Sequence, residues 1–145
     1  MRILIVDGHS VIFAWPEMRR LHEKRMTLAR DAVVKLLTGY QDSTGVHVVA
    51  VFDGKGAKKS TETTEPGGIQ IFYSGADRTA DDIIERLTAT YGREHDITVA
   101  TSDLLEQQTV ISFGAQTVSA ETLKTMISEA QGDLQRRLKQ HRKKL

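Results

Sequence analysis

Five aspartates stand at points where the chain pattern would bring carboxylates together. Asp7, Asp53 and Asp103 each follow a short apolar run, in the segments RILIVD, VHVVAVFD and DITVATSD. Asp81 and Asp82 are neighbours in RTADDIIERL, at the start of a helical pattern. Crowded like charges raise one another's pKa, so a cluster of these acids would need a cation to hold it together. Hard carboxylate oxygens point to Mg²⁺ or Mn²⁺ as that cation.

Each of these aspartates also has an ordinary structural explanation. Asp7 and Asp53 both precede glycine, and Asp-Gly is common turn chemistry. Thr79 is a suitable N-cap, and an acid three residues later, Asp82, would interact well with the helix dipole. Three strand-end acids together with an adjacent pair are harder to explain in this way. The pattern as a whole favours a metal site.

The elements that would position the acids alternate between strands and helices. GIQIFYSG and AQTVSA indicate further short strands, and near-continuous Val/Ile runs are typical of parallel sheets. Amphipathic helices are predicted for TLARDAVVKLLTGYQDS, ADDIIERLTATYG and LLEQQTVISFG, the last two closed by a glycine suited to a C-cap. A long final helix is expected from Ser119. This alternation predicts a three-layer α/β fold whose strand ends share one edge, where such folds bind ligands.

One long segment, DGKGAKKSTETTEPGG, fits no helix or strand. It contains three lysines and four glycines, and it is interpreted as a mobile surface loop of functional importance. Its GKGAKKS stretch lacks the G-x-x-x-x-G-K-[ST] spacing of a phosphate-binding loop. A nucleotide-binding site of that type is therefore not expected.

Composition limits the classes of function. A chain of 145 residues suits one domain, and the absence of cysteine excludes disulfides, thiolate catalysis and cysteine zinc sites. No apolar run approaches the roughly 18 residues of a membrane span and no signal peptide is visible, so a cytoplasmic protein without membrane association is expected. From residue 133 onward the chain has six Lys/Arg and one acid. This basic end indicates a polyanionic partner, or else a solvated helix end whose cations suit the helix dipole.

Two known folds place acids at this edge of a sheet, the phosphoacceptor receiver domain and the PIN-type nuclease. A receiver normally carries a tandem acid pair after its first strand and a Lys-Pro near its last one. Here Asp7 is followed by Gly8 and His9, and the prolines are Pro16 and Pro66. The receiver fold is therefore the weaker of the two interpretations.

Four long segments resemble the YacP-like NYN family, a bacterial branch of PIN-like ribonucleases. They are ILIVDGHSVIFAWPEMRRL, ARDAVVKLLTGYQDSTGVHVVAVFDG, DRTADDIIERL and VATSDLLEQQTVISFGAQTVSAETL. The resemblance implies a PIN-like, Rossmann-like fold with a mainly parallel central sheet flanked by helices. It implies a nuclease domain over residues 1–134, followed by a basic helix end over residues 135–145. The activity that it implies is that of a Mg²⁺-dependent endoribonuclease acting on messenger RNA in a ribosome-associated context.

The acids of the family's DGYN, TAD and TSD motifs fall on Asp7, Asp81 and Asp103. These three are expected to hold the metal, with Asp53 and Asp82 supporting catalysis. DGYN has become DGHS, so His9 and Ser10 replace the family's Tyr and Asn. Ser10 can still hydrogen-bond a carboxylate or water, with fewer groups than an amide.

The change to His-Ser leaves open an alternative function, a catalytically weakened RNA- or ribosome-binding module, although retention of the strand-end acids argues against it. His9 is either a phosphate contact or a partly exposed loop residue, and Trp15 either stacks on a base or belongs to the core. The residues expected to bind RNA are His9, Ser10, Ser102, Lys55, Lys58, Lys59, Arg136 and Arg137, with Arg142, Lys143 and Lys144 further along the basic end.

Overall fold

A single sheet of six strands lies at the centre of the part of the chain that the computed structural model describes, residues 1–54, 56–64 and 67–144 without the side chain at 144. The strand order is β3-β4-β2-β1-β5-β6. Every neighbouring pair is parallel except β3 with β4. The strands are β1 (Arg2–Asp7), β2 (His47–Asp53), β3 (Thr61–Thr64), β4 (Gln70–Ser74), β5 (Asp96–Ala100) and β6 (Gln116–Val118).

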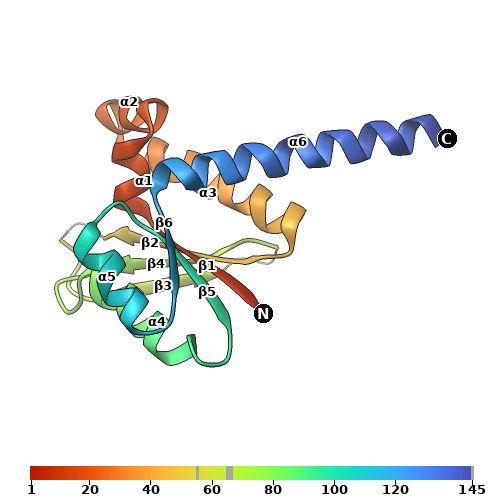
Figure 1. The fold of residues 1–145 in the computed structure, drawn as a ribbon. Helices are drawn as coiled ribbons and strands as arrows, with labels where there is room; N and C mark the ends of the chain where they lie inside the picture. The colour runs from red at the N-terminus through yellow and green to blue at the C-terminus, as the bar shows by residue number, and fades with distance from the viewer. Residues whose placement is uncertain (55, 65–66, 145) are drawn as a thin grey trace.

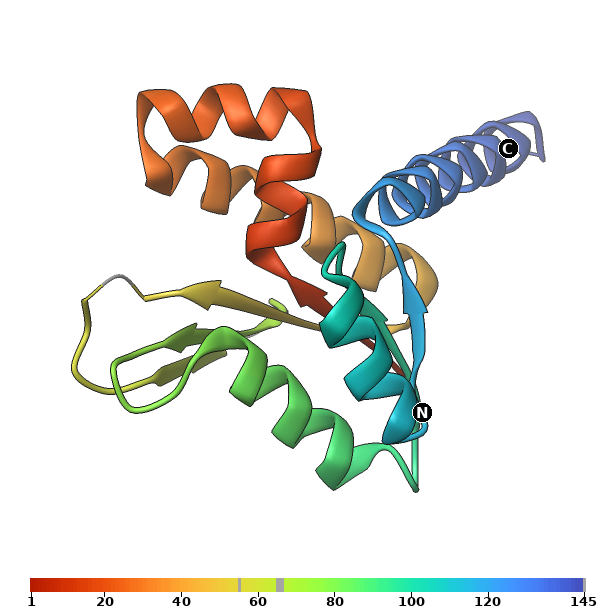
Figure 2. The same cartoon turned by 60° about the vertical axis from the view of Figure 1, so that its left-hand side comes forward.

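Helices cover both faces of this sheet (Figures 1 and 2). The helices α1, α2, α3 and α6 pack on one face, and α4 and α5 pack on the other. The three-layer α/β prediction, with a mainly parallel sheet, is therefore confirmed. The helix bounds are α1 (Gly8–Ala14), α2 (Pro16–Lys24), α3 (Met26–Thr44), α4 (Ala80–Tyr91), α5 (Leu104–Ser112) and α6 (Ala120–Lys144).

The central strand β1 is buried on both faces. Leu4 and Val6 belong to the core under α3 and α6, whereas Ile5 belongs to the core under α4 and α5. Successive side chains of a strand point to opposite faces, so one apolar run serves both cores. Parallel pairing with β2 and β5 then fixes where β1 ends, with Asp7 opposite Val51. The position of Asp7 is therefore set by two neighbouring strands.

Trp15, which directly follows α1, is buried in the core and hydrogen-bonded to the start of α6. Its side chain is 1% exposed, and its indole N–H donates to the carbonyl of Ala120 at 2.8 Å. Trp15 therefore has the core role and is not available to stack on a base. It also precedes Pro16, which begins α2 at the helix position where proline's missing N–H costs nothing.

Two details differ from the sequence-based expectations. The segment interpreted as a mobile loop contains β3, whose Thr61 pairs with Tyr73 of β4; its TETT sequence has no apolar alternation and forms an exposed edge strand. The short helices α1 and α2 were not predicted, because their buried apolar residues are too few for a clear period.

The last helix begins as predicted and then leaves the body of the protein. The Ser119 hydroxyl accepts the Thr122 N–H at 3.1 Å, so Ser119 acts as the N-cap of α6. Beyond its first turns α6 extends away from the sheet, and residues 133–143 are all exposed (Figure 1). Within the described ranges, no helix combines the length and apolarity needed to cross a membrane.

Two glycines allow a matched test of packing. A Cβ on Gly8, where β1 turns into α1, would overlap the ring of Phe52 and come within 2.9 Å of the Val51 carbonyl. A Cβ on Gly39, in the middle of α3, would meet nothing within 4 Å. We expect Gly8→Ala to lower the free energy of unfolding by about 1–3 kcal/mol, and Gly39→Ala to raise it by about 0.5–1 kcal/mol. Urea denaturation measures both, and equal effects would contradict the close approach at Gly8.

Candidate functional site

Four of the predicted aspartates line one open hollow at the carboxyl edge of the sheet. Asp7 ends β1, Asp53 ends β2, Asp81 stands in the first turn of α4, and Asp103 precedes α5. The hollow has a volume of about 410 Å³. Its remaining lining residues are His9, Ser10, Ser74, Gly75, Thr79 and Ala80. The structure thus brings together acids from four separate segments, at the edge that the parallel sheet predicted.

Two hydroxyl groups fix one oxygen of the buried Asp7 carboxylate. Ser10 donates to Asp7 Oδ2 at 2.8 Å, and Thr101 donates to the same oxygen at 3.0 Å. Each hydroxyl also accepts a backbone N–H, from Ser102 at 3.0 Å for Ser10 and from Asp103 at 3.2 Å for Thr101. Ser10 therefore makes the carboxylate contact that was expected of it. Thr101, which the sequence did not single out, links Asp7 to the backbone of Asp103.

Asp81 and Asp82 have different roles, since Asp82 caps α4 and Asp81 lines the hollow. Thr79 and Asp82 form a reciprocal capping box, with the Asp82 N–H donating to Thr79 Oγ1 at 3.1 Å and the Thr79 N–H donating to Asp82 Oδ2 at 3.4 Å. Asp81 is the member of the pair that lines the hollow. Loss of hydration raises the pKa of Asp81, and the negative charges of Asp7 and Asp103 raise it further.

A buried glutamate lies behind these acids. Glu106 of α5 is 3% exposed, and its backbone N–H donates to Asp103 Oδ1 at 3.3 Å. Burial raises the pKa of Glu106 to about 8, with further contributions from Asp81, from Glu85 and from its hydrogen bond to Glu85. Its Oε1 atom is buried without a hydrogen-bond partner. Sequence reasoning missed Glu106, although its i,i+4 spacing to the buried Val110 places it on the inner face of α5.

The donor chemistry of the hollow fits a hard divalent cation. Every candidate ligand is a carboxylate or hydroxyl oxygen. Burial raises the pKa of Asp81, and the neighbouring carboxylates raise it further through a repulsion that a cation would relieve. In the described part of the chain, however, no three His, Cys, Asp or Glu side chains are already arranged to hold a metal ion. One oxygen of Asp103 caps α5 through the Leu105 N–H at 2.9 Å. Metal binding would therefore require the carboxylates to draw together.

The remaining predicted residues lie around or away from the hollow. Asp53 Oδ1 accepts the Ser74 hydroxyl at 3.5 Å, and the Ser102 hydroxyl accepts the Ala120 N–H at 3.4 Å. Lys58 and Lys59 are exposed on a loop that packs against Gly75, a residue of the hollow. Lys55 lies outside the described residues.

The basic end of α6 is separate from the acids. Arg136 is paired with Asp133, and Arg137 lines a different hollow between α3 and α6.

The buried Glu106 predicts a specific pH dependence of stability. A carboxyl whose pKa is about 8 in the folded state and 4.5 ordinarily must take up a proton to fold, so it makes the protein less stable as pH rises from about 4.5 to 8. Gln resembles the protonated form and can donate to the same neighbour, Glu85. We expect Glu106→Gln to be more stable than the native chain at pH 8, on the order of a few kcal/mol, since each pKa unit corresponds to about 1.4 kcal/mol.

Denaturant titrations in chelator at about pH 5, 6.5 and 8, which span the window of the Glu106 pKa shift, measure this effect. The gain from Glu106→Gln should shrink toward pH 5, and the exposed Glu129→Gln should show no such trend. A gain that stays constant with pH would show that Glu106 is charged in the folded protein.

Comparison with known proteins identifies relatives over nearly the whole chain. The sequence model of the YacP-like NYN domain matches residues 4–145. The uncharacterised protein YacP of Bacillus subtilis is 31% identical over 140 residues, covering 96% of this chain and 82% of its own length. The crystal structure of Rae1 (YacP) from Bacillus subtilis gives a TM-score of 0.79 at 33% identity, covering 99% of this chain and 83% of that one. A mutant of Rae1 (YacP) gives 0.80 at 30% identity, with 95% and 81% covered. The chain therefore belongs to the YacP-like NYN family, with its PIN-like, nuclease-type fold.

Proposed function

We propose that this protein is a metal-dependent endoribonuclease that hydrolyses phosphodiester bonds of RNA. The observation that carries the proposal is the convergence of Asp7, Asp81 and Asp103 on one open hollow, from three separate parts of the chain. Membership of a family with a nuclease-type fold supports hydrolysis over the receiver-type chemistry that similar acids serve elsewhere. PIN-like and NYN nucleases typically use divalent metals, which agrees with the all-oxygen donor set.

Hydrolysis adds water across one P–O bond, leaving a phosphate on one fragment and a hydroxyl on the other. Asp7, Asp81 and Asp103 would hold Mg²⁺ or Mn²⁺, which neutralises phosphoryl charge and lowers the pKa of water. The hydroxyls of Ser10 and Thr101 hold Asp7 in one orientation. The α5 amides hold one oxygen of Asp103, so two of the three acids are already oriented in the hollow, although the three would still have to draw together around an ion.

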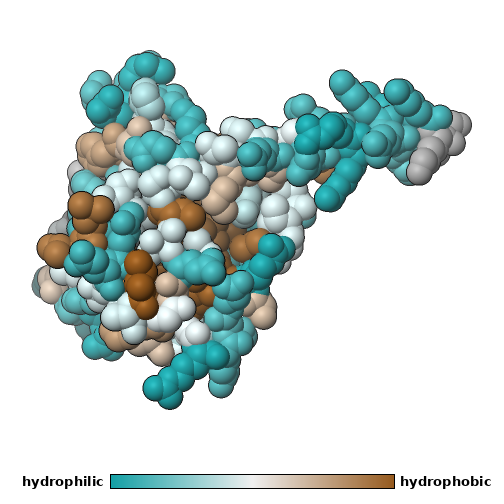
Figure 3. Space-filling view, viewed as in Figure 1, coloured by the Kyte–Doolittle hydropathy of each residue, from teal (hydrophilic) through white to brown (hydrophobic). Residues whose placement is uncertain are grey.

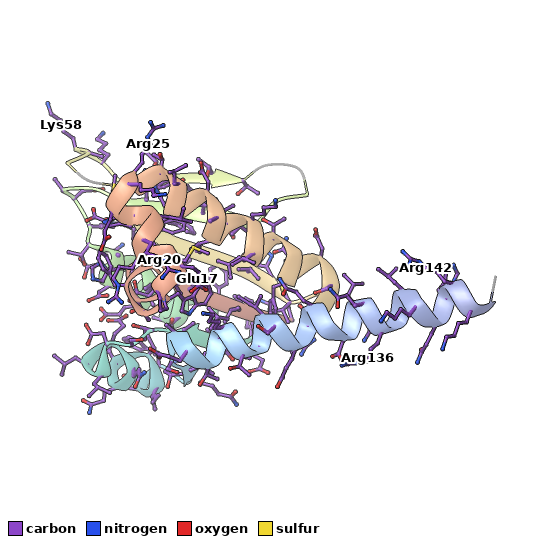
Figure 4. All side chains as sticks on the ribbon, turned by 90° about the horizontal axis from the view of Figure 1, so that it is seen from above. Glu17, Arg20, Arg25, Lys58, Arg136 and Arg142 are labelled. Atoms are coloured by element: carbon purple, nitrogen blue, oxygen red, sulfur yellow. The ribbon has the colours of Figure 1, made fainter. Side chains whose placement is uncertain are left out.

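Cationic side chains would hold the RNA backbone at two separate places. Figure 4 shows Lys58 and Arg25 at one end of the molecule, and Arg136 and Arg142 along the projecting α6 at the other. The face of the outer half of α6 that Figure 3 shows is mostly hydrophilic, which agrees with a helix that meets a polyanion. The family resemblance extends the proposal to messenger RNA met at the ribosome, with the basic helix end as the anchoring element.

Removal of single carboxylates tests the proposed centre. Asp7→Asn and Asp81→Asn keep the side-chain shape but remove a negative ligand. We expect each to lower RNA cleavage by more than about 100-fold, beyond the 10- to 100-fold typical of groups that only support a ligand. Asp82→Asn should have a smaller effect because Asn is an equally good helix cap. The measurement is single-turnover cleavage of a labelled RNA in Mg²⁺, in Mn²⁺ and in chelator.

Asp96→Asn is the matched control, an exposed acid at the opposite end of the sheet where β5 begins. A second readout is thermal stability, since a bound cation relieves the repulsion around Asp81. Mg²⁺ should raise the melting temperature of the native chain and of Asp96→Asn, but much less that of Asp81→Asn. Undiminished cleavage by Asp7→Asn or Asp81→Asn would refute the proposed centre, and binding of RNA without cleavage in either metal would favour the binding-module alternative.

The two basic regions should have separable effects. A chain ending at Leu134 should bind RNA and ribosomes more weakly. The slope of the logarithm of its RNA-binding constant against the logarithm of salt concentration should become shallower by about 0.7–0.9 for each phosphate that the shortened chain no longer binds. Cleavage of a short RNA at saturating concentration should barely change, because this helix end is remote from the acids. Changing Lys58 and Lys59 to Ala should instead slow cleavage of the short RNA.

A second variant separates charge from helix length. Replacing Arg137, Lys139, Arg142 and Lys143 with Gln keeps the length of α6 while removing four of the six cations of this end, and it should reproduce most of the effect of the truncation. Binding curves at several salt concentrations, beside ribosome co-sedimentation, make the comparison. If the truncated chain binds RNA and ribosomes as tightly as the full chain at every salt, the helix end is simply solvated.

A further inference from the structure

A second hollow adjoins the acidic one and differs from it in character. It lies between α1, the start of α3 and the end of β2, and its volume is about 190 Å³. Phe13, Met26 and Phe52 give it largely apolar walls. His9 and Asp53 line both hollows, so the two lie side by side. Whatever occupies the second hollow therefore lies beside the carboxylates.

Three flat rings form a row along this second hollow. The ring centroids of His9 and Phe13 are 4.6 Å apart, and those of Phe13 and His22 are 5.0 Å apart. The i,i+4 spacing of His9 and Phe13 on α1 places both rings on one side of the helix. Phe13 remains 41% exposed. A partly exposed aromatic ring that stands between two imidazoles offers a surface on which a planar ligand can stack.

The dimensions and the polar groups restrict that ligand. Drug-sized ligands occupy pockets of about 300–1,000 Å³, so a hollow of this size suits a single ring system. His22, Asp53 and Arg30 supply hydrogen-bonding groups among the apolar walls. The guanidinium of Arg30 lies 5.2 Å from the centroid of the Tyr73 ring, which supports its position. A planar ligand with polar edges fits these groups, and a purely aliphatic one does not.

We propose that this second hollow binds one unstacked nucleobase of single-stranded RNA, next to the phosphate that faces the acids. The inference rests on the proposed function and deepens it. Single-stranded nucleic acids are held by stacking of their bases on aromatic side chains together with cations along the backbone. Arg25 and Lys58, at the same end of the molecule, are placed to meet the phosphates (Figure 4). Because a base inside a duplex cannot turn into this hollow, the site selects unpaired RNA.

The test uses Phe13 and a matched phenylalanine elsewhere. Phe13→Leu keeps apolar volume but removes the aromatic face, and Phe13→Tyr keeps the ring. Phe113, which is 42% exposed at the end of α5, is the control, as Phe113→Leu. RNA binding is measured for each chain in the Asp81→Asn background, so that the RNA stays intact. We expect Phe13→Leu to weaken binding about 5- to 150-fold, the range for one base stacked on one aromatic residue. Phe13→Tyr and Phe113→Leu should bind as the parent does.

The RNA supplies the second half of the test. A set of short oligomers carries an abasic site, or the fluorescent base 2-aminopurine, at one position at a time. At one position the abasic site should weaken binding by the parent as much as Phe13→Leu does, with no further weakening when the two are combined. At that same position 2-aminopurine fluorescence should be quenched by the parent and by Phe13→Tyr, but not by Phe13→Leu.

Several outcomes would overturn the inference. One is equal RNA binding by Phe13→Leu and Phe113→Leu. Another is weakening by Phe13→Leu that is independent of the abasic position, which would mark Phe13 as a general surface contact, as for a protein partner. Failure of the proposed function looks different: the native chain would leave RNA uncleaved in Mg²⁺ and Mn²⁺ while the position-specific quenching persists. Thermal melting of each variant shows whether weaker binding comes from unfolding.

Discussion

Crowded negative charge at one sheet edge is the constraint on which the rest of this structure depends. Parallel pairing places β1 between β2 and β5, so the acid that ends β1 is surrounded by segments that carry others. Burial raises the pKa values of Asp81 and Glu106, and repulsion from the neighbouring carboxylates raises both further. Hydroxyl donors hold the buried Asp7 carboxylate in place, and the amides at the start of α5 hold Asp103. Two apolar cores, one on each face of the sheet, provide the rigidity that this arrangement requires.

The tight connection between β1 and α1 links the acids to the aromatic hollow. No loop separates the two elements, since α1 begins at Gly8 directly after Asp7. The close approach of Gly8 to Phe52 brings the first turn of α1 against the end of β2. His9 therefore faces both hollows, and Phe13 follows one turn later. Catalytic chemistry and base recognition, as proposed, would share one rigid corner of the fold.

The main architecture and most of the acidic site could be predicted from sequence because they depend on local signals. Apolar runs that end in aspartate mark Asp7 and Asp53, and the three-residue spacing from Thr79 identifies Asp82 as a cap. Glu106 could not be found in the same way, because an acid in a first helical turn is ordinarily solvated. Only the packing of α5 against the sheet buries it. The strand β3 was not predicted because its polar sequence TETT has no apolar alternation. It is a strand only because it pairs with β4.

The projecting half of α6 forms without the free-energy cost of starting a new helix. An isolated helix of about a dozen residues is marginal in water, because its first turn must form at the expense of chain entropy. Here the first half of α6 is already ordered by Leu123 and Ile127, which are buried in the core. The outer half, whose residues 133–143 are exposed, therefore grows from an existing nucleus by one hydrogen bond per residue. Its backbone amides should exchange with solvent progressively faster toward the C-terminal end of the helix. A bound partner that orders this end should slow that exchange.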